Sequence, residues 1–292
     1  MPEALVGVIG GSGLYQIEGL TEGEEFFSDT PWGKPSDALM VGKLDGVSVA
    51  FLPRHGRGHR ISPTDLPVQA NIYAFKMLGV KYILSVSAVG SMKEEIPPLD
   101  LVVPDQIFDR TVARPRTYFG DHSEIVGHIP FAAPFCQSLQ PILKEVSEAS
   151  GANTHYGGTY ICIEGPQFST RGESLIYRQW GVDVIGMTAI PEAKLAREAE
   201  IHYVLLACAT DYDCWHDSHE SVTVEMVVEN LQKNVGRAKE IIRRFVPLAA
   251  ALPEDHLECG CDKALSTAIM TDRTRVPAES VQKLGLLVQK YF

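Results

Sequence analysis

Short apolar runs recur along this chain, and most of them are followed by a polar turn and then by a segment with helical periodicity. Runs of strand length occupy residues 5–9, 47–52, 80–86, 99–103, 158–163, 182–185 and 203–209. Helical patterns occupy residues 65–78, 134–150, 173–180, 194–200 and 220–231. Because parallel strands need such crossover connections, we predict an α/β fold with a largely parallel or mixed central sheet flanked by helices.

The domain organisation follows from length and from the absence of sequence boundaries. No internal repeat, low-complexity tract or obvious linker divides the 292 residues, which suffice for one large domain. We predict that residues 1–246 form this domain. Residues 247–292 are predicted to be a C-terminal helical appendage of the same domain.

Charge and apolar patterning exclude several classes of protein. The formal net charge of −11 disfavours binding to nucleic acid or to an anionic membrane. No apolar stretch reaches the length of a membrane span, and the first residues lack the basic start of a secretion signal. We therefore expect a cytoplasmic protein that acts on small molecules.

A glycine-rich turn, Gly10-Gly11-Ser12-Gly13, follows the first predicted strand. Glycine backbones approach anions closely, and the hydroxyl of Ser12 adds a donor. The turn lacks the last glycine of a dinucleotide-binding fingerprint and the lysine of a P-loop. It predicts a site for a small anion, with a plain tight turn as the alternative.

Basic and hydroxyl side chains follow other predicted strands. The segment 53–60 contains five basic-type residues, of which Arg54 and His55 come first after the strand at 47–52. In an acidic protein such a cluster indicates a phosphate or carboxylate site, with a solvated basic patch as the alternative. Ser87 and Thr188 are hydroxyl donors that also follow strands. Together they predict an anion site at one edge of the sheet.

Two carboxylates, Asp211 and Asp213, follow the apolar run at 203–209. At strand spacing both side chains point the same way, so they can accept protons or hydrogen bonds from one ligand, such as a purine. The alternative is a helix N-cap before residues 220–231. Phe168, Ser169 and Met187 are candidate walls of this site, although Phe168 can equally belong to the core.

Seven segments give the chain a close resemblance to the trimeric purine nucleoside phosphorylase family, and within it to the branch of 5′-methylthioadenosine phosphorylases. They are Gly10–Leu14, Arg54–Arg57, Ala88–Ser91, Asp109–Thr111, Ile163–Ser169, Met187–Thr188 and Ala209–Trp215. The last segment is the most specific, because phosphorylases of 6-oxopurines place asparagine where Asp213 stands. The resemblance covers about residues 6 to 246.

This resemblance implies cleavage of methylthioadenosine by phosphate to adenine and 5-methylthioribose 1-phosphate, without a metal or an organic cofactor. It implies a homotrimer, or a dimer of trimers. It assigns phosphate binding to Ser12, Arg54, His55, Ser87 and Thr188. It assigns the base site to Ala88, Phe168, Ser169, Asp211 and Asp213, and the ribose contact to Met187. In this chemistry a protonated Asp213 shares its proton with N7 of the purine.

The methylthio end of such a substrate needs an apolar slot. Val224, Val227 and Val228 fall on one stripe of the helix after the carboxylates, which suits a slot or ordinary core packing equally well. The resemblance favours the slot. It also implies that His128, which spacing alone assigns to the surface, reaches into the active site of a neighbouring subunit.

The cysteines give a weaker signal. Cys259-Gly260-Cys261, with His256 before it, is a single cluster without a second ligand pair, so a disulfide or a free dithiol is favoured over zinc. The other four cysteines are interpreted as scattered small core residues. No catalytic role is expected for the cysteines at 259 and 261.

Three rival functions remain open on the sequence. The first is a phosphorylase of inosine or guanosine, which an Asp213→Asn variant tests. The second is a nucleoside sensor without catalysis, and the third is a nucleosidase, which does not require phosphate.

Overall fold

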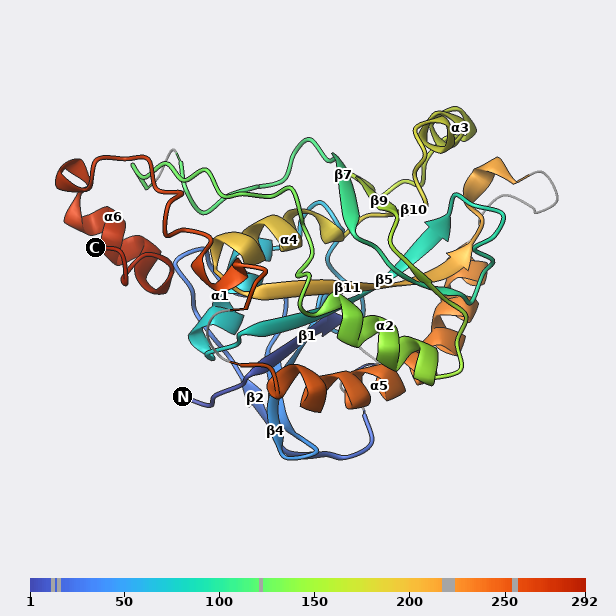
Figure 1. Ribbon diagram of the computed structural model, residues 1–292, viewed down its shortest axis with the longest axis horizontal. Coiled ribbons are helices and arrows are strands. Elements are labelled where there is room, and N and C mark those ends of the chain that lie inside the picture. The colour runs from blue at the N-terminus through green and yellow to red at the C-terminus, as the bar shows by residue number, and fades with distance from the viewer. Residues whose placement is uncertain (12–13, 15–16, 121–122, 217–223, 254–256) are drawn as a thin grey trace.

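The fold is a twisted mixed sheet with helices on both faces (Figure 1). It is taken from a computed structural model. The structure describes residues 1–292 apart from 12–13, 15–16, 121–122, 217–223 and 254–256, and apart from the side chains of 224–227 and 231. Within the described residues, eleven strands form one sheet. The predicted α/β class is confirmed.

Strand β5 lies at the centre of the sheet. The bounds of the strands are β1 Val6–Gly10, β2 Leu20–Phe26, β3 Leu39–Leu44, β4 Val47–Pro53, β5 Tyr82–Ser91, β6 Leu101–Val103, β7 Gln106–Arg110, β8 Thr154–Tyr156, β9 Thr159–Ile163, β10 Val184–Gly186 and β11 His202–Asp211. Strand β5 pairs in parallel with β1 and β11 and antiparallel with β10. The main path runs β2-β3-β4-β1-β5-β10-β9-β7, while β11 joins β5 to β6 and β8.

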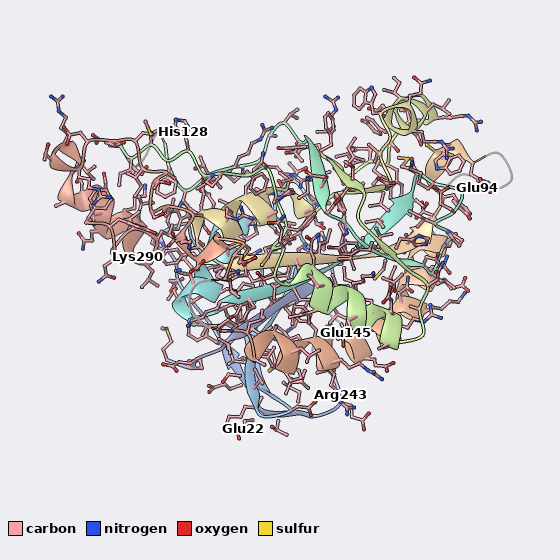
Figure 2. All side chains as sticks on the ribbon, viewed as in Figure 1. Glu22, Glu94, His128, Glu145, Arg243 and Lys290 are labelled. Atoms are coloured by element: carbon pink, nitrogen blue, oxygen red, sulfur yellow. The ribbon has the colours of Figure 1, made fainter. Side chains whose placement is uncertain are left out.

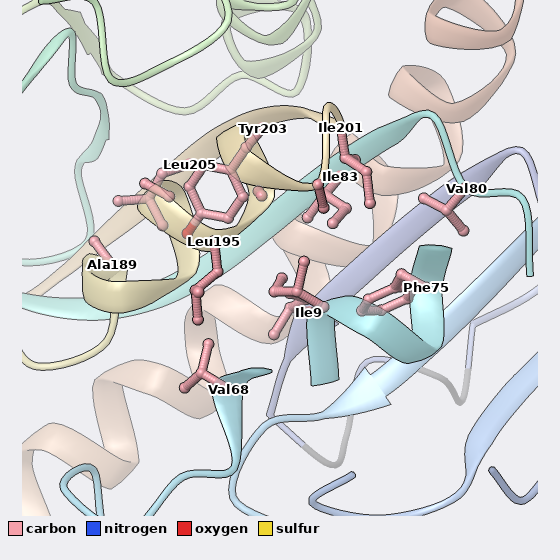
Figure 3. Close-up of a cluster of buried hydrophobic side chains, with 14 of the residues drawn as sticks. Ile9, Val68, Phe75, Val80, Ile83, Ala189, Leu195, Ile201, Tyr203 and Leu205 are labelled. Carbon is pink, nitrogen blue, oxygen red and sulfur yellow. The ribbon is translucent and has the colours of Figure 1, made fainter. Parts of the chain in front are cut away.

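The helices divide between the two faces of the sheet. Their bounds are α1 Val68–Met77, α2 Gln140–Ala149, α3 Arg171–Gln179, α4 Ala189–Glu198, α5 Val224–Ala250 and α6 Ala278–Leu284. Helices α1 and α4 cover one face and α2 and α5 the other (Figure 1). On the first face, Ile9, Phe75, Leu195 and Tyr203 interlock in one buried apolar cluster (Figure 3).

Two helices begin later than the sequence pattern predicted, and proline explains one of the two shifts. Helix α1 begins at Val68 and not near residue 65, because Leu66 precedes Pro67 and a residue before proline is disfavoured in helical backbone. Helix α2 begins at Gln140 and not at residue 134. Pro141 lies in its first turn, where proline is well tolerated.

Strand β5 is longer than predicted and continues to Ser91. The expected break after residue 86 is wrong, because β10 and β11 supply hydrogen-bonding partners as far as Gly90 and Ser91. Ser87 and Ala88 therefore lie within a strand, and not in a loop after one. A long strand holds these residues in fixed register with β11.

Four strands were not predicted, namely β2, β3, β7 and the three-residue strand β8, which pairs with β6. The residues of β2 are mostly polar and exposed, so they carry no buried-strand signal. Strand β3 pairs with β4 as a hairpin, and β7 lies in the segment 105–130 that was expected to be a long loop. These strands acquire their conformation from pairing with neighbours.

The C-terminal tail is packed against the domain. Helix α5 runs past residue 246, so the predicted division falls inside a helix. After it come short 3₁₀ turns and α6. Leu265, Ala268, Leu284 and Val288 of the tail are buried in the same cluster as Ile9. Across the described residues, no helix combines the length and the apolar character needed to cross a bilayer.

Candidate active site

The two aspartates stand where β11 ends. Asp211 is the last residue of β11 and Asp213 begins a 3₁₀ turn, Asp213–Trp215. Both side chains are buried, with 6% and 7% of their surface exposed. Asp213 has a φ of +53°, so the chain leaves the strand between the two residues and strand spacing does not relate them. The expectation that they face one way as alternate strand residues is wrong.

Asp211 holds the backbone that carries Asp213. One carboxylate oxygen of Asp211 accepts the N–H of Asp213 at 2.8 Å, and the other accepts the hydroxyl of Thr210 at 2.7 Å. Burial, with the charge of Asp213 as a further cause, raises the pKa of Asp211 although these two bonds oppose the shift. Asp211 therefore caps the local turn that carries Asp213.

Asp213 meets the segment after β9. The hydroxyl of Ser169 lies 3.2 and 3.0 Å from the two carboxylate oxygens of Asp213, and the Cys214 thiol donates to the Ser169 carbonyl at 3.3 Å. Phe168, beside Ser169, has 47% of its surface exposed, so in this chain it is not a core residue. Met187 is half-buried at the end of β10. The predicted base-site residues Ser169 and Asp213 are thus in contact.

Gly90 makes room for both aspartates. A Cβ at this position would lie 3.0 Å from an Asp211 carboxylate oxygen, 3.0 Å from Ile185 Cγ2 and 3.2 Å from Asp213 Cβ. We expect Gly90→Ala to lower kcat/KM at least tenfold and to destabilise the fold by about 1–3 kcal/mol through overpacking. Steady-state kinetics and urea unfolding check both effects.

Gly236→Ala is the matched control for this substitution. Gly236 lies in α5, where a Cβ would meet no described atom within 4 Å beyond the helix's own backbone, and alanine favours helix over glycine. It is expected to leave activity unchanged and stability equal or higher. A Gly90→Ala enzyme as active as this control would show that the close approach has no role.

Arg54 lies at the other side of the site, buried beside an acid that the sequence reading did not single out. Its guanidinium bonds Glu192 at 2.5 and 3.2 Å, Ser85 Oγ at 2.5 Å and the Val86 carbonyl at 3.0 Å. Tyr203 and Ser85 also donate to Glu192. Burial by itself lowers the pKa of Arg54, whereas the charge and the hydrogen bond of Glu192 raise it, and the net result is a raised pKa. These bonds use four of the five guanidinium N–H groups, which leaves one on Nη1.

His55 is half-buried and tied to its own loop. Its Nδ1 donates to the Ile61 carbonyl at 2.9 Å, and its ring stacks on His59 at 4.2 Å. Burial, and next the charge of Arg54, lower the pKa of His55 to about 4. At neutral pH the ring is uncharged and its Nε2 is an acceptor, which suits a protonated oxygen of phosphate.

This pKa makes stability depend on pH. The unfolded chain binds the histidine proton near pH 6.5, whereas the folded chain resists it until about pH 4. The stabilisation is therefore complete above pH 6.5 and is lost as pH falls toward 4, by on the order of 3 kcal/mol. Urea unfolding across this range should show a shallower loss for His55→Gln than for the parent. Equal slopes would contradict the assignment.

Two predicted anion donors meet directly. Ser87 Oγ and Thr188 Oγ1 lie 3.1 Å apart although 101 residues separate them. The hydroxyl of Tyr160 lies 3.5 Å from Ser87 Oγ and accepts the Thr188 N–H at 3.4 Å, and burial raises the Tyr160 pKa to about 12. Hydroxyls free to rotate can turn their protons toward an anion. Tyr160 is a member of this group that the sequence reading missed.

Arg114 ties together the segments that follow β9 and β10. It is buried and donates to the carbonyls of Met187, Ile190 and Glu164, and to the Glu164 carboxylate at 3.0 Å. In the sequence Arg114 is one arginine in a segment interpreted as a polar loop, so little distinguished it from a surface residue. Glu192 had a clearer signal, as a lone acid in the apolar run 189–193.

Several predicted site residues cannot be placed in this group. Ser12 and the side chains of Val224 and Val227 lie outside the described residues. Val228 has 44% of its surface exposed, and Ala88 is half-buried in β5. His128 is exposed and lies far from the turn that carries Asp213 (Figures 1 and 2).

The cysteines are arranged differently from the prediction. None of the six is in a disulfide, so Cys259 and Cys261 are free thiols. Cys136, interpreted as a scattered core residue, lies 3.6 Å from Cys259. His256 lies outside the described residues. The histidine beside these thiols is His202, at the opposite end of β11 from Asp211.

Known proteins share both the sequence and the fold. The S-methyl-5′-thioadenosine phosphorylase of Geobacter sulfurreducens is 53% identical to this chain, and the match covers 99% of each protein. That of Gloeobacter violaceus is 52% identical, and the match covers 99% of this chain and 97% of the relative. A methylthioadenosine phosphorylase structure from an antarctic soil metagenomic library matches with a TM-score of 0.92 at 46% identity, covering 98% of this chain and 99% of its own.

A methylthioadenosine phosphorylase from Schistosoma mansoni in complex with adenine has a TM-score of 0.84 at 35% identity, over 92% of this chain and 99% of its own. The sequence model of the phosphorylase superfamily matches residues 5–247, which include all the strands and every residue of the site described above. The chain belongs to the phosphorylase superfamily.

Proposed function

We propose that this enzyme cleaves S-methyl-5′-thioadenosine with phosphate, to adenine and 5-methylthioribose 1-phosphate. Full-length relatives at about half identity carry that activity in their names. The observation that carries the proposal is that the Asp213 carboxyl group is buried and accepts a hydrogen bond from the Ser169 hydroxyl. Ser87, which meets Thr188, stands three residues before Gly90 on β5, about 10 Å along the strand, which is the scale of one nucleoside.

Asp213 acts on the purine base. A phosphate oxygen forms a bond to C1′ of the ribose while the C1′–N9 bond breaks, and its electron pair moves into the purine. A protonated Asp213 gives its proton to N7, which completes neutral adenine. Because both oxygens of Asp211 already accept bonds from within the chain, Asp211 positions the turn of Asp213. Ser169 orients the Asp213 carboxyl group.

The phosphate end falls to Arg54, His55, Ser87 and Thr188, with Ser12 as the expected fifth member. The Glu192 pairing fixes the Arg54 guanidinium before phosphate arrives, so little side-chain entropy is lost on binding. Phosphate held below the ribose stabilises the positive charge that develops on the sugar. The reaction as proposed uses phosphate as a co-substrate and needs neither metal nor cofactor.

The test is adenine release from methylthioadenosine with and without phosphate, with inosine in parallel. Release that requires phosphate, together with little hypoxanthine from inosine, supports the proposal. Release without phosphate indicates a nucleosidase, and preferential cleavage of inosine contradicts the assignment of Asp213. Tight binding of the nucleoside without turnover indicates a sensor.

We also propose a homotrimer in which His128 closes the methylthio slot of a neighbouring subunit. The loop that carries His128 exposes Val112 and Val126, with 78% and 46% of their surfaces open, as an interface would require. The slot itself is assigned to Val224, Val227 and Val228. The corresponding biological role is salvage, in which the purine is recovered and the methylthio sugar is returned to methionine. The predicted location is the cytoplasm.

Mixed oligomers test the neighbour's contribution. His128→Ala and Asp213→Asn subunits are each expected to be weakly active alone. After they are unfolded and refolded together, sites with both native residues form, so activity should rise several-fold above the sum of the separate proteins. Activity equal to that sum would show that His128 does not act across subunits.

A further inference from the structure

A second constellation of reactive side chains lies away from the active site. We name it the thiol–histidine cluster, and it consists of Cys136, His202, Cys259 and Cys261. The potential ligand atoms of these four residues all lie within 4.8 Å of one another. The Sγ atoms of Cys136 and Cys259 are each 3.3 Å from Nδ1 of His202 and 3.6 Å from each other. Cys259 is half-buried, and the other three residues are buried.

Three separate parts of the chain supply the cluster, and each is held by backbone bonds. Cys136 precedes α2, and its N–H donates to the Tyr203 carbonyl at 2.8 Å. His202 begins β11, and its N–H donates to the Lys81 carbonyl at 2.9 Å. Gly260, between the two tail cysteines, has a φ of +62°, which glycine adopts without strain. This turn lets two cysteines only two residues apart face one centre.

The spacing fits a shared metal ion better than a disulfide. Zinc bonds of about 2.3 Å to sulfur and 2.0–2.1 Å to nitrogen in a tetrahedron separate two sulfurs by about 3.8 Å, and sulfur from nitrogen by about 3.6 Å. The observed separations are 3.6 and 3.3 Å. A disulfide between Cys136 and Cys259 would require about 2.05 Å.

Thiolates are the forms of cysteine that bind metal, and one positive charge lies near the cluster. The charge belongs to the buried guanidinium of Arg197, which acts on Cys261. Three thiolates, a neutral imidazole and a divalent ion would carry a net charge of −1, which Arg197 offsets.

We propose that the thiol–histidine cluster binds one zinc ion through three sulfurs and Nδ1 of His202. Each thiol loses its proton to solvent as its bond to zinc forms. Four protein ligands complete the tetrahedron and leave no position for substrate, so the site is structural. It lies at the start of β11, about 30 Å along the strand from Asp211, and is independent of the proposed reaction.

The ion would fasten the C-terminal tail to the sheet. Two of its ligands belong to the tail, while the other two belong to β11 and to the segment before α2. Farther along, Lys290 pairs with Glu200 at 2.6 Å, and the Ala268 carbonyl accepts the N–H of His128 at 2.9 Å (Figure 2). A fastened tail therefore supports the backbone of the loop that carries His128.

The experiment measures metal in the full-length protein, purified without chelator or affinity metal, by elemental mass spectrometry. The expected result is about one zinc per chain and six thiols titratable after unfolding in chelator. Cys261→Ser should lower bound zinc at least fivefold and the unfolding temperature by roughly 5–10 °C. Cys208→Ala is the matched control, a buried cysteine of β11 outside the cluster, and should retain full zinc.

Replacement of zinc by cobalt keeps the test decisive if the serine variant fails to fold. Protein produced with cobalt should show the visible absorption bands of a tetrahedral thiolate site, and these bands should vanish on zinc addition. Less than 0.2 metal ions per chain after incubation with excess zinc, or a disulfide among Cys136, Cys259 and Cys261, would overturn the proposal. An octahedral cobalt spectrum would overturn it as well.

Discussion

Replacement of Asp213 by asparagine is expected to lower kcat/KM for S-methyl-5′-thioadenosine by about 10²–10⁴-fold. Asparagine keeps the shape of the side chain but cannot supply a carboxylic acid proton to N7. Asn also tolerates the left-handed backbone at this position, so the turn should survive. Steady-state kinetics with methylthioadenosine and inosine measure the effect, and preference should move toward inosine.

Asp45→Asn is the matched control for Asp213→Asn. Asp45 also has a left-handed backbone, with φ of +49°, but its side chain is exposed on the surface. This control shows the effect of removing one negative charge, and of placing asparagine at a residue with left-handed backbone, away from the catalytic site. If Asp213→Asn retained the rate of this control, Asp213 would not be the proton donor.

The second large effect concerns stability. We expect Glu192→Ala to lower the free energy of unfolding by about 3–5 kcal/mol, because it strands the buried guanidinium of Arg54 without its carboxylate. Tyr203 and Ser85 also lose their acceptor in this variant. Urea unfolding in phosphate-free buffer measures the change.

A double-mutant cycle separates the ion pair from the rest of this loss. Arg54→Met added to Glu192→Ala removes the stranded charge, so the double variant should regain about 2 kcal/mol relative to the sum of the single variants. The double variant should be inactive, because Arg54 is one of the proposed phosphate ligands. Additive effects on stability would show that the two residues are not coupled.

Local patterns were enough to identify the fold class and most of the candidate residues. Alternation of apolar runs and helical segments gave the strands around β5 and β11, since side-chain periodicity is a short-range property. The segment Ala209–Trp215 pointed to the candidate base site. The sequence also marked Ser87 and Thr188 as donors that follow apolar runs, although Ser87 turned out to lie within a strand.

Pairing between distant segments was decided by the tertiary structure alone. Glu192 lies 138 residues from Arg54, and their contact depends on how α4 packs against α1 and β11. No periodicity reveals that β10 runs antiparallel to β5, which makes the sheet mixed, one of the two arrangements that the sequence left open. Cys136 and His202 gave no sign in the sequence of meeting the tail cysteines.

The sequence by itself thus determined which side chains are available, and the fold decided which of them meet. The left-handed backbone of Asp213 shows the reason. Two carboxylates two residues apart predict a shared face only if the strand continues, and here the strand ends between them. Short-range sterics set strand and helix, whereas sheet order and the burial of charge fix the long-range contacts that make a site.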